Sequence, residues 1–174
     1  MPKWPAKVRM TDIVDPKTRS RMMAGIRSKG TRPETLVRSL LHKRGLRFAR
    51  TPSGLPGRPD VVLPRWRVAV FVNGCFWHMH ECGLFRMPGS NQEFWERKLS
   101  ANQFRDRKNI QALLVDGWKV LTIWECSVRG SDAMRQLERN MDRVAAWIRS
   151  NSRKNHCVLS GTGLTCRKYD YEGN

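Results

Sequence analysis

Acidic residues are scarce in this chain, which has 15 aspartates and glutamates against 33 lysines and arginines and a formal net charge of +18. This excess predicts a polyanionic partner, because each phosphate that a basic side chain neutralises releases condensed counterions. We expect nucleic acid, with an acidic membrane surface as the alternative. The sequence also lacks an uncharged stretch of membrane-spanning length, and no apolar run follows its basic N-terminus. We therefore expect a cytoplasmic protein without a membrane partner.

Cysteines are few and odd in number, with five in the chain. An odd number fits a disulfide framework poorly, and thiols in the cytoplasm stay reduced. Reduced cysteines near histidines are typical of metal ligands, so we expect a metal site rather than disulfides.

The hydrophobic periodicity predicts one α/β domain over residues 15–149, with a flexible arm at 1–14 and a disordered basic tail at 150–174. Strands are expected at residues 46–50, 60–63, 67–72 and 119–124. Helices are expected at residues 16–28, 31–45, 90–117 and 131–149. This order predicts an α/β sandwich around a mixed sheet.

Two of the expected helices begin with capping-box patterns, in which a hydroxyl residue precedes a glutamate by three positions. Thr31 precedes Glu34 in this way, and Ser90 precedes Glu93. Glycines near the far ends of these helices are expected to stop them, because glycine readily adopts a left-handed conformation.

Asp60 directly follows a proline at the mouth of an apolar strand. Nucleases of the restriction-enzyme class place a metal-binding carboxylate at such a point, because Mg²⁺ prefers oxygen ligands and phosphodiester cleavage needs charge neutralised at the attacking and leaving oxygens. The usual acid-x-Lys motif on the next strand is missing, since that strand ends in Val72-Asn73-Gly74. Taken alone, Asp60 could equally be an aspartate that closes a turn.

The segment from Cys75 to Cys82 contains two cysteines, His78 and His80. Zinc prefers thiolate and imidazole ligands in a tetrahedral array, and Cys126 offers a fourth ligand at the end of a later strand. The spacing does not choose between the two histidines, and buried unligated cysteines are the alternative. Four protein ligands would leave no open position, so such a zinc ion would be structural.

Aromatic residues lie within and near this segment. Phe76 and Trp77 suit stacking between bases, with core packing as the alternative. Trp95, Asn102 and Asp106 share one face of the expected long helix. A buried carboxylate there needs a partner, and a histidine held by Asp106 would keep one ring nitrogen for proton transfer. A solvated Asp106 on the surface is the alternative.

The region from Pro16 to about Gly130 resembles the very short patch repair endonucleases, bacterial enzymes that nick DNA beside T·G mismatches left by deamination of 5-methylcytosine. The matching segments are Thr18-Arg19-Ser20, Leu55-Pro56-Gly57-Arg58-Pro59-Asp60, Gly74-Cys75-Phe76-Trp77-His78-x-His80-x-Cys82, Glu93-Phe94-Trp95, Arg105-Asp106-Arg107 and Trp124-Glu125-Cys126. The resemblance implies a restriction-endonuclease-like, three-layer fold with a structural zinc site.

The resemblance also implies roles for individual residues. Asp60 and the carbonyl of Val72 would bind catalytic Mg²⁺, with two ions expected, and Glu34 would assist through water. His78, oriented by Asp106, would transfer the proton of the attacking water. The zinc ligands would be Cys75, His80, Cys82 and Cys126. The DNA-contacting residues would be Phe76, Trp77, Trp95 and Met23, and Asn102 is expected with them.

One position departs from the family pattern, which often has a histidine where this chain has Asn73. Asparagine can hydrogen-bond a phosphate or a metal-bound water but cannot carry a proton, so the pattern gives His78 more weight and predicts slower or differently pH-dependent turnover. The sequence thus predicts a monomeric, Mg²⁺-dependent enzyme that nicks 5′ to the thymine of a T·G mismatch in double-stranded DNA and can have repair-pathway protein partners. The alternatives are a nuclease of the same fold with another DNA specificity and a zinc-stabilised DNA-binding protein.

Overall fold

The computed structural model describes residues 15, 17–18, 21, 30–49, 54–129 and 133–168. The predicted arm at 1–14, most of the predicted helix at 16–28 with Met23, and the end of the chain from 169 lie outside the described residues.

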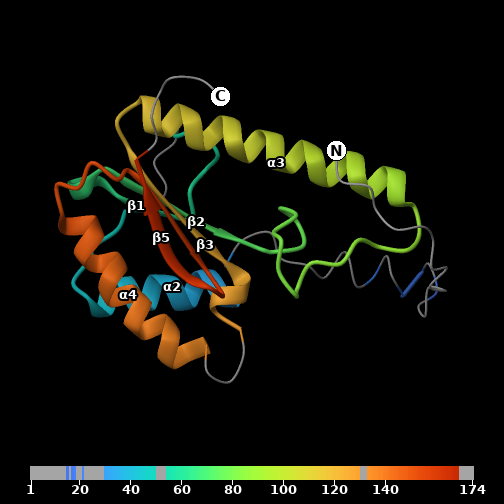
Figure 1. Cartoon of the computed structure of the whole chain (residues 1–174), viewed down its shortest axis with the longest axis horizontal. Helices are drawn as coiled ribbons and strands as arrows, with labels where there is room; N and C mark the ends of the chain where they lie inside the picture. Colours follow the sequence, from blue (N-terminus) through green and yellow to red (C-terminus); the bar gives the residue numbers. More distant parts are fainter. Residues whose placement is uncertain are drawn as a thin grey trace.

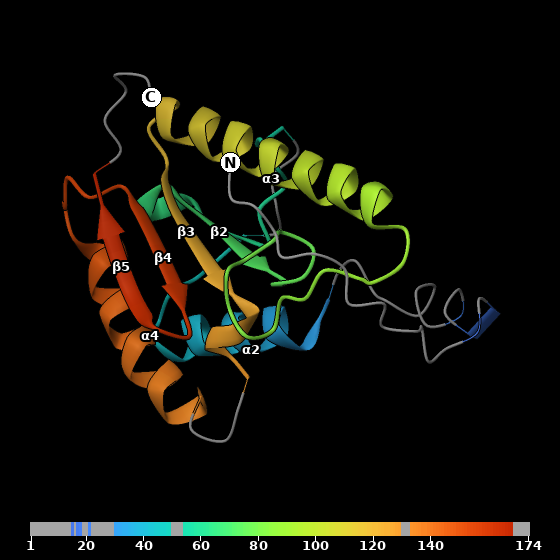
Figure 2. The ribbon, with the colours of Figure 1, turned by 45° about the vertical axis from the view of Figure 1, so that its right-hand side comes forward.

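A mixed five-stranded sheet lies between helices on both of its faces (Figures 1 and 2). The strands, in their order across the sheet, are β1 (Val61–Leu63), β2 (Val68–Asn73), β3 (Lys119–Trp124), β4 (His156–Ser160) and β5 (Gly163–Arg167). The three central strands are parallel, and each edge strand pairs antiparallel with its neighbour. This is the α/β fold with a mixed sheet that the sequence predicts.

The helices divide unequally between the two faces of the sheet. Helices α2 (Arg32–Lys43) and α4 (Ala133–Arg149) cover one face, and the long helix α3 (Gln92–Val115) crosses the other (Figure 2). The α2/α4 face holds the larger core, which includes Leu41, Leu121 and Ile148. The α3 face has a small core of Ala69, Leu113, Leu114 and Val120. Most of the stabilising apolar burial therefore lies on the α2/α4 side.

Of the four ends of α2 and α3, three follow the predicted signals. Thr31 and Glu34 form both hydrogen bonds of a capping box at the start of α2. Beyond α2, Gly45 has φ of +72° and donates to the His42 carbonyl at 2.9 Å. Gly117 similarly follows α3 with φ of +76°. The positive φ values suit glycine because it has no Cβ to clash.

Two local predictions are wrong. The residue that caps α3 is Asn91, not Ser90, and it does so in a left-handed conformation with no side-chain capping bond. Asparagine tolerates this conformation better than most residues. The strand expected at 46–50 is reduced to a single bridge between Ala49 and Val62. The N–H of Leu46 donates to the Leu41 carbonyl and closes the end of α2, so strand pairing starts late.

The predicted disorder of residues 150–174 is also wrong over most of that segment, because β4 and β5 extend the sheet there. Cys157 and Leu159 alternate into the α2/α4 core, but this pattern is too short to stand out among basic and polar neighbours. The expectation of reduced cysteines needs the same correction, since Cys157 and Cys166 form a disulfide between directly paired positions. Three free cysteines remain among the described residues.

Candidate active site and metal cluster

The ends of β2 and β3 bring the predicted metal ligands together. Asn73 and Trp124 are paired in the parallel register, so the segments after both strands leave the same edge of the sheet. Cys75 follows β2, and Cys126 lies in the 3-10 helix η2 (Glu125–Ser127) that follows β3. The loop then folds back to add His80 and Cys82, and the ligand atoms of the four residues all lie within 4.8 Å of one another.

The geometry of this cluster suits a metal ion. The Nδ1 atom of His80 lies 3.6 Å from the sulfur of Cys75 and 3.6 Å from that of Cys126. A tetrahedral zinc ion, with bonds of about 2.1 Å to nitrogen and about 2.3 Å to sulfur, would separate such atoms by about 3.6 Å. The ring of His80 stacks on Trp124, with ring centroids 4.2 Å apart, which fixes its direction. The structure therefore places His80, and not His78, beside the three cysteines, a choice that the spacing alone left open.

Burial shifts the pKa of three groups in the cluster toward their neutral forms. Burial lowers the pKa of His80, so this imidazole is neutral and can act as a ligand. Burial raises the pKa of the Cys75 and Cys126 thiols, whereas the N–H of Gly161 acts to lower that of Cys126. A bound divalent ion reverses the effect of burial, since coordinating thiols lose their protons.

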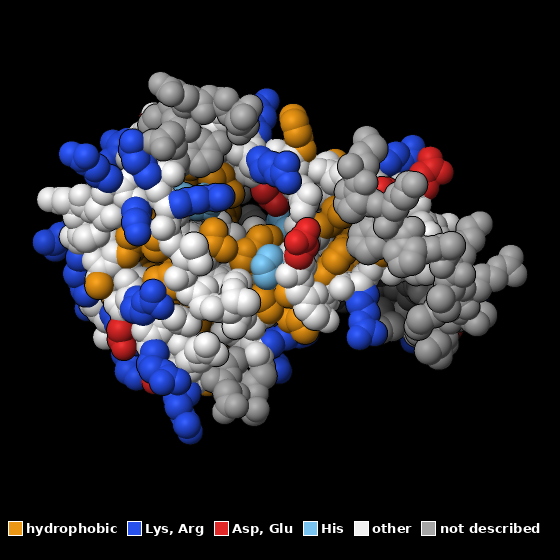
Figure 3. Space-filling view, in the orientation of Figure 1, with side chains coloured by type: hydrophobic (Ala, Val, Ile, Leu, Met, Phe, Trp, Pro, Cys, Tyr) orange, Lys and Arg blue, Asp and Glu red, His pale blue; other side chains and the backbone are white. Residues whose placement is uncertain are grey.

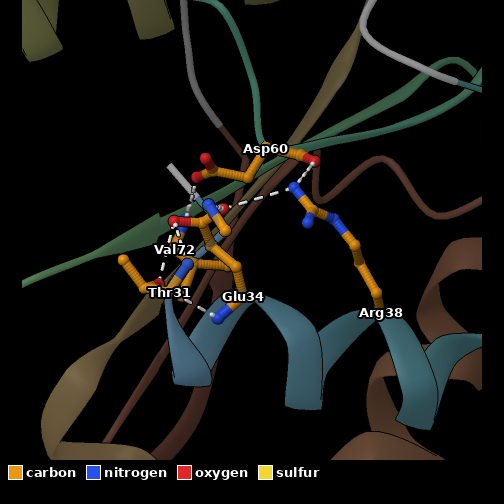
Figure 4. A network of polar contacts seen from close by, with 6 residues as sticks. Thr31, Glu34, Arg38, Asp60 and Val72 are labelled. Carbon is orange, nitrogen blue, oxygen red and sulfur yellow. Dashed lines mark hydrogen bonds and ion pairs between the residues drawn. The ribbon is translucent and has the colours of Figure 1, made fainter. Parts of the chain in front are cut away.

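A second polar group lies where β1 begins, against β2 and the start of α2 (Figure 4). The Oδ2 atom of Asp60 accepts a hydrogen bond of 2.7 Å from the N–H of Val72. The pKa of Asp60 is raised to about 6, mainly by burial and in part by the nearby Glu34 carboxylate, whereas Val72, Arg38 and His78 act to lower it. The effect of Glu34 on Asp60 shows that the two carboxylates lie close enough for each to disfavour the charged form of the other.

Glu34 is almost fully buried and is held from several directions. Its carboxylate accepts hydrogen bonds from the N–H of Gly30 at 2.9 Å and from the Thr31 hydroxyl at 2.8 Å. Arg38 donates to Glu34 at 3.3 Å and to the carbonyl of Asp60 at 3.1 Å, so one guanidinium links α2 to the start of β1. The sequence reasoning missed Arg38, although its position four residues after Glu34 on a helix was a usable signal.

His78 and Asp106 form the predicted pair. The Nδ1 atom of His78 lies 2.5 Å from Oδ2 of Asp106, and both side chains are partly exposed. This contact fixes the ring orientation and leaves Nε2 available. The charge of His78 also influences Asp60, so the two groups lie close enough to interact electrostatically. Asn73, the last residue of β2, is mostly buried.

The predicted aromatic residues form one half-buried cluster. The ring centroid of Phe76 lies 5.1 Å from that of Trp77 and 5.5 Å from that of Trp95. Lys98 places its ammonium 5.6 Å from the Trp77 ring and 5.4 Å from the Trp95 ring. Rings that remain half exposed beside a cation are available for contact with a nucleic acid.

The amides of α3 hold the loop that carries these rings. Asn102 donates to the carbonyl of Trp77 at 3.0 Å, and its own oxygen accepts from Arg105. Gln103 donates to the carbonyls of His78 and Met79 at 3.2 and 3.3 Å. The structure thus gives Asn102 partners within the protein, and it adds Gln103, which sequence reasoning missed because an amide on a helix carries no distinctive signal.

Lysine and arginine side chains are spread over the face shown in Figure 3, with few acidic ones among them. In the part of the chain that the structure describes, no helix has both the length and the apolar character needed to cross a membrane.

A mixed sheet between helices, with Asp60 and Glu34 where β1 begins and a Cys/His cluster after β2 and β3, fits the restriction-endonuclease-like fold of nucleases. Comparison with known proteins narrows this class. Residues 11–84 match the model of the family described as DNA mismatch endonuclease Vsr. The chain belongs to this family and is a DNA endonuclease.

Individual relatives agree with this assignment. The type II nicking enzyme V.XorIIP of Xanthomonas oryzae pv. oryzae is 43% identical over 132 residues, which cover 76% of this chain and 97% of that relative. The DNA mismatch endonuclease Vsr of Escherichia coli is 42% identical over 139 residues, covering 80% of this chain and 88% of that protein. The type II nicking enzyme V.HpaIIP of Haemophilus parainfluenzae is 32% identical over 130 residues, covering 74% and 89%.

Proposed function

We propose that this protein is a Mg²⁺-dependent mismatch endonuclease that nicks one DNA strand 5′ to the thymine of a T·G pair, acting as a monomer. The observation that carries the proposal is that the Asp60 and Glu34 carboxylates, which we call the carboxylate corner, lie close to the His78–Asp106 pair. Membership of the mismatch endonuclease family supports it.

Asp60 is the main candidate to hold the magnesium, together with the backbone carbonyl of Val72, and Glu34 would act through bound water. The donor set fits a hard cation, because it consists of oxygens and includes two carboxylates that repel each other without one. Bound magnesium would neutralise charge on the phosphate and make water a better nucleophile.

His78 is the proton-transfer group in this proposal. Asp106 holds Nδ1, so Nε2 faces the reaction and can take a proton from the attacking water. Asn73 cannot carry a proton, and its amide can only orient the phosphate or a water molecule. The proton therefore passes through a single imidazole.

Zinc is the metal that we propose for the cluster. Thiolate and imidazole are the preferred ligands of zinc, and the two distances from His80 to the sulfurs of Cys75 and Cys126 are those that a tetrahedral zinc ion would set. Four protein ligands leave no position for substrate. The ion would therefore brace the loop that carries His78 and the aromatic cluster, without taking part in the chemistry.

Mismatch selection would come from the aromatic cluster. Phe76, Trp77 and Trp95 would enter the base stack beside a T·G pair, which is easier to unstack than a Watson–Crick pair. Asn102 and Met23 are proposed as further DNA contacts.

Nicking of two duplexes that differ only in a T·G against a T·A pair, with Mg²⁺ present and the cut mapped to the nucleotide, tests the proposal. We expect one cut 5′ to the mismatched thymine and none in the matched duplex. Equal cutting of both would support a nuclease of another specificity, and binding without cutting would support a DNA-binding protein.

A further inference from the structure

The turn between β4 and β5 lies against the metal cluster. Gly161 and Thr162 join the two strands, and the backbone N–H of Gly161 donates to the sulfur of Cys126 at 3.3 Å. A Cβ atom at Gly161 would lie 3.6 Å from the Cys126 carbonyl oxygen and 3.8 Å from its sulfur, so the turn is in contact with this ligand over more than one atom. The contact comes from the part of the chain that the sequence pattern failed to predict.

The sheet itself brings this turn to the cluster. Strands β3 and β4 are parallel, and Ile123 pairs with Leu159, so the turn after β4 and the helix η2 after β3 leave the same edge side by side. Cys126 lies in η2, three residues beyond this pair, and Gly161 lies two residues beyond it. The position of Gly161 against Cys126 therefore follows from strand register.

The hairpin that presents Gly161 is cross-linked. Cys157 and Cys166 occupy directly paired positions in β4 and β5 and form a disulfide. At the turn, the hydroxyls of Ser160 and Thr162 are 2.8 Å apart, and the N–H of Thr162 donates to the Ser160 hydroxyl. These contacts limit the movement of the strands and of the turn, so the Gly161 N–H keeps a constant direction.

We propose that the β4–β5 hairpin is an outer wall of the metal site, in which the Gly161 N–H hydrogen-bonds the metal-bound sulfur of Cys126 and slows loss of the ion. This inference rests on the proposed metal site. A donor to a thiolate ligand withdraws part of its charge and fixes its direction, and removing partners of this kind typically weakens metal binding roughly 10- to 100-fold. The Cys157–Cys166 disulfide contributes by holding the donor in place.

Removal of this one donor tests the proposal. Cys157 is a natural ligation point, so a synthetic peptide for residues 157–174 can carry glycolic acid in place of Gly161, which exchanges the N–H for an ester oxygen. The matched control is the all-amide chain joined at the same cysteine. We expect the ester chain, loaded with zinc, to release it to an excess of colorimetric chelator about 10-fold faster. With cobalt in place of zinc, we expect the sulfur-to-metal charge-transfer band to shift.

Equal release rates and identical cobalt spectra for the ester and amide chains would overturn the inference while leaving the zinc site intact. Failure of the all-amide chain to hold a metal would instead overturn the proposed zinc site, and the inference with it. As a second variant, Cys157→Val with Cys166→Val keeps apolar side chains in the pair but removes the cross-link. We expect a smaller acceleration of zinc release there, and Gly161→Ala, which keeps the N–H, should match the wild type.

Discussion

The metal cluster and the carboxylate corner lie at the same edge of the sheet, but the protein supports them in different ways. Between residues 74 and 90, Cys75 is the one buried residue, so the loop of the cluster has little core of its own. The corner, by contrast, is fixed by a capping box, by the Val72 N–H and by Arg38. With the ions that we propose, the first site would need its ion to keep its shape, whereas the second would need one only to balance charge and to react.

Removal of one ligand from the cluster should have the largest effect. We expect Cys126→Ala to lose the metal, because binding of a structural zinc ion typically contributes on the order of 10 kcal/mol and the loop has no core to replace it. Nicking should fall below detection. Hydrogen exchange followed by mass spectrometry should show loss of protection at residues 74–90 and little change in α2 and α4. Unchanged protection of residues 74–90 would contradict the view that this loop depends on its ion. Chelator treatment of the wild type serves as the control.

Removal of a cluster ligand should destabilise its loop, whereas removal of the Asp60 charge should stabilise the metal-free protein. The pKa of Asp60 is raised from 3.8 to about 6 in the folded protein, so folding favours the protonated form and the charged form costs stability as pH rises through this range. Asp60→Asn should therefore abolish nicking yet stabilise the metal-free protein at pH 8 by at most about 3 kcal/mol. Solvent screening of the partly exposed carboxylate makes the gain smaller than this limit.

Thermal unfolding with and without Mg²⁺ measures this effect. Magnesium should raise the melting temperature of the wild type and leave that of Asp60→Asn unchanged. A variant less stable than the metal-free wild type would mean that the carboxylate is structural.

The His78–Asp106 contact should affect the rate alone. We expect Asp106→Asn to slow single-turnover nicking about 10²- to 10⁴-fold. The amide would no longer favour the His78 tautomer with its proton on Nδ1, which leaves Nε2 free to accept the proton of water. Metal content and T·G duplex binding should stay near those of the wild type, and they are the controls. A normal rate would show that proton transfer does not depend on the contact of His78 with Asp106.

Much of the fold was predictable from the sequence, since β2, β3, α2 and α3 carry clear periodicity and glycine or capping signals at their ends. The ligand set of the cluster was not fixed by spacing, because His78 and His80 are two residues apart and the choice depends on how the loop turns back toward Cys126. Family resemblance named His80, and the structure places its Nδ1 between two sulfurs.

The hairpin was not predictable for a different reason. Cys157, Leu159, Leu164 and Cys166 are apolar at alternate positions, but each strand has only five residues, and Val158 between Cys157 and Leu159 obscures the alternation in β4. Their stability comes from pairing with β3 and from the core beneath, which are contacts distant in sequence. Gln103 was missed for the same reason, because its role depends on backbone carbonyls of another segment, whereas the spacing of Arg38 from Glu34 was a signal that the sequence did carry.

The prediction with the smallest expected effect on nicking concerns His156, which pairs with Val120 near the start of β3, at the opposite end of the strand from both sites. Burial lowers the pKa of His156 from 6.5 to about 4, with a contribution from Arg167. The unfolded chain therefore binds a proton that the folded chain refuses, and the stability present above pH 6.5 is lost as pH falls toward 4. The loss should reach about 3 kcal/mol.

His156→Leu isolates this effect, because it keeps an apolar side chain and removes the titration. Urea unfolding at pH 7 and pH 5 should show a smaller loss of stability in the variant, with nicking at pH 8 unchanged. The variant also exposes the contribution of Asp60, whose sign is opposite: protonation of that carboxyl below pH 6 stabilises the fold. Adding Asp60→Asn to His156→Leu should therefore remove the gain in stability that the single variant shows as the pH falls. The wild type, the two single variants and the double variant should therefore differ in how their unfolding free energy changes with pH. Parallel profiles of all four would contradict the roles given to His156 and to Asp60.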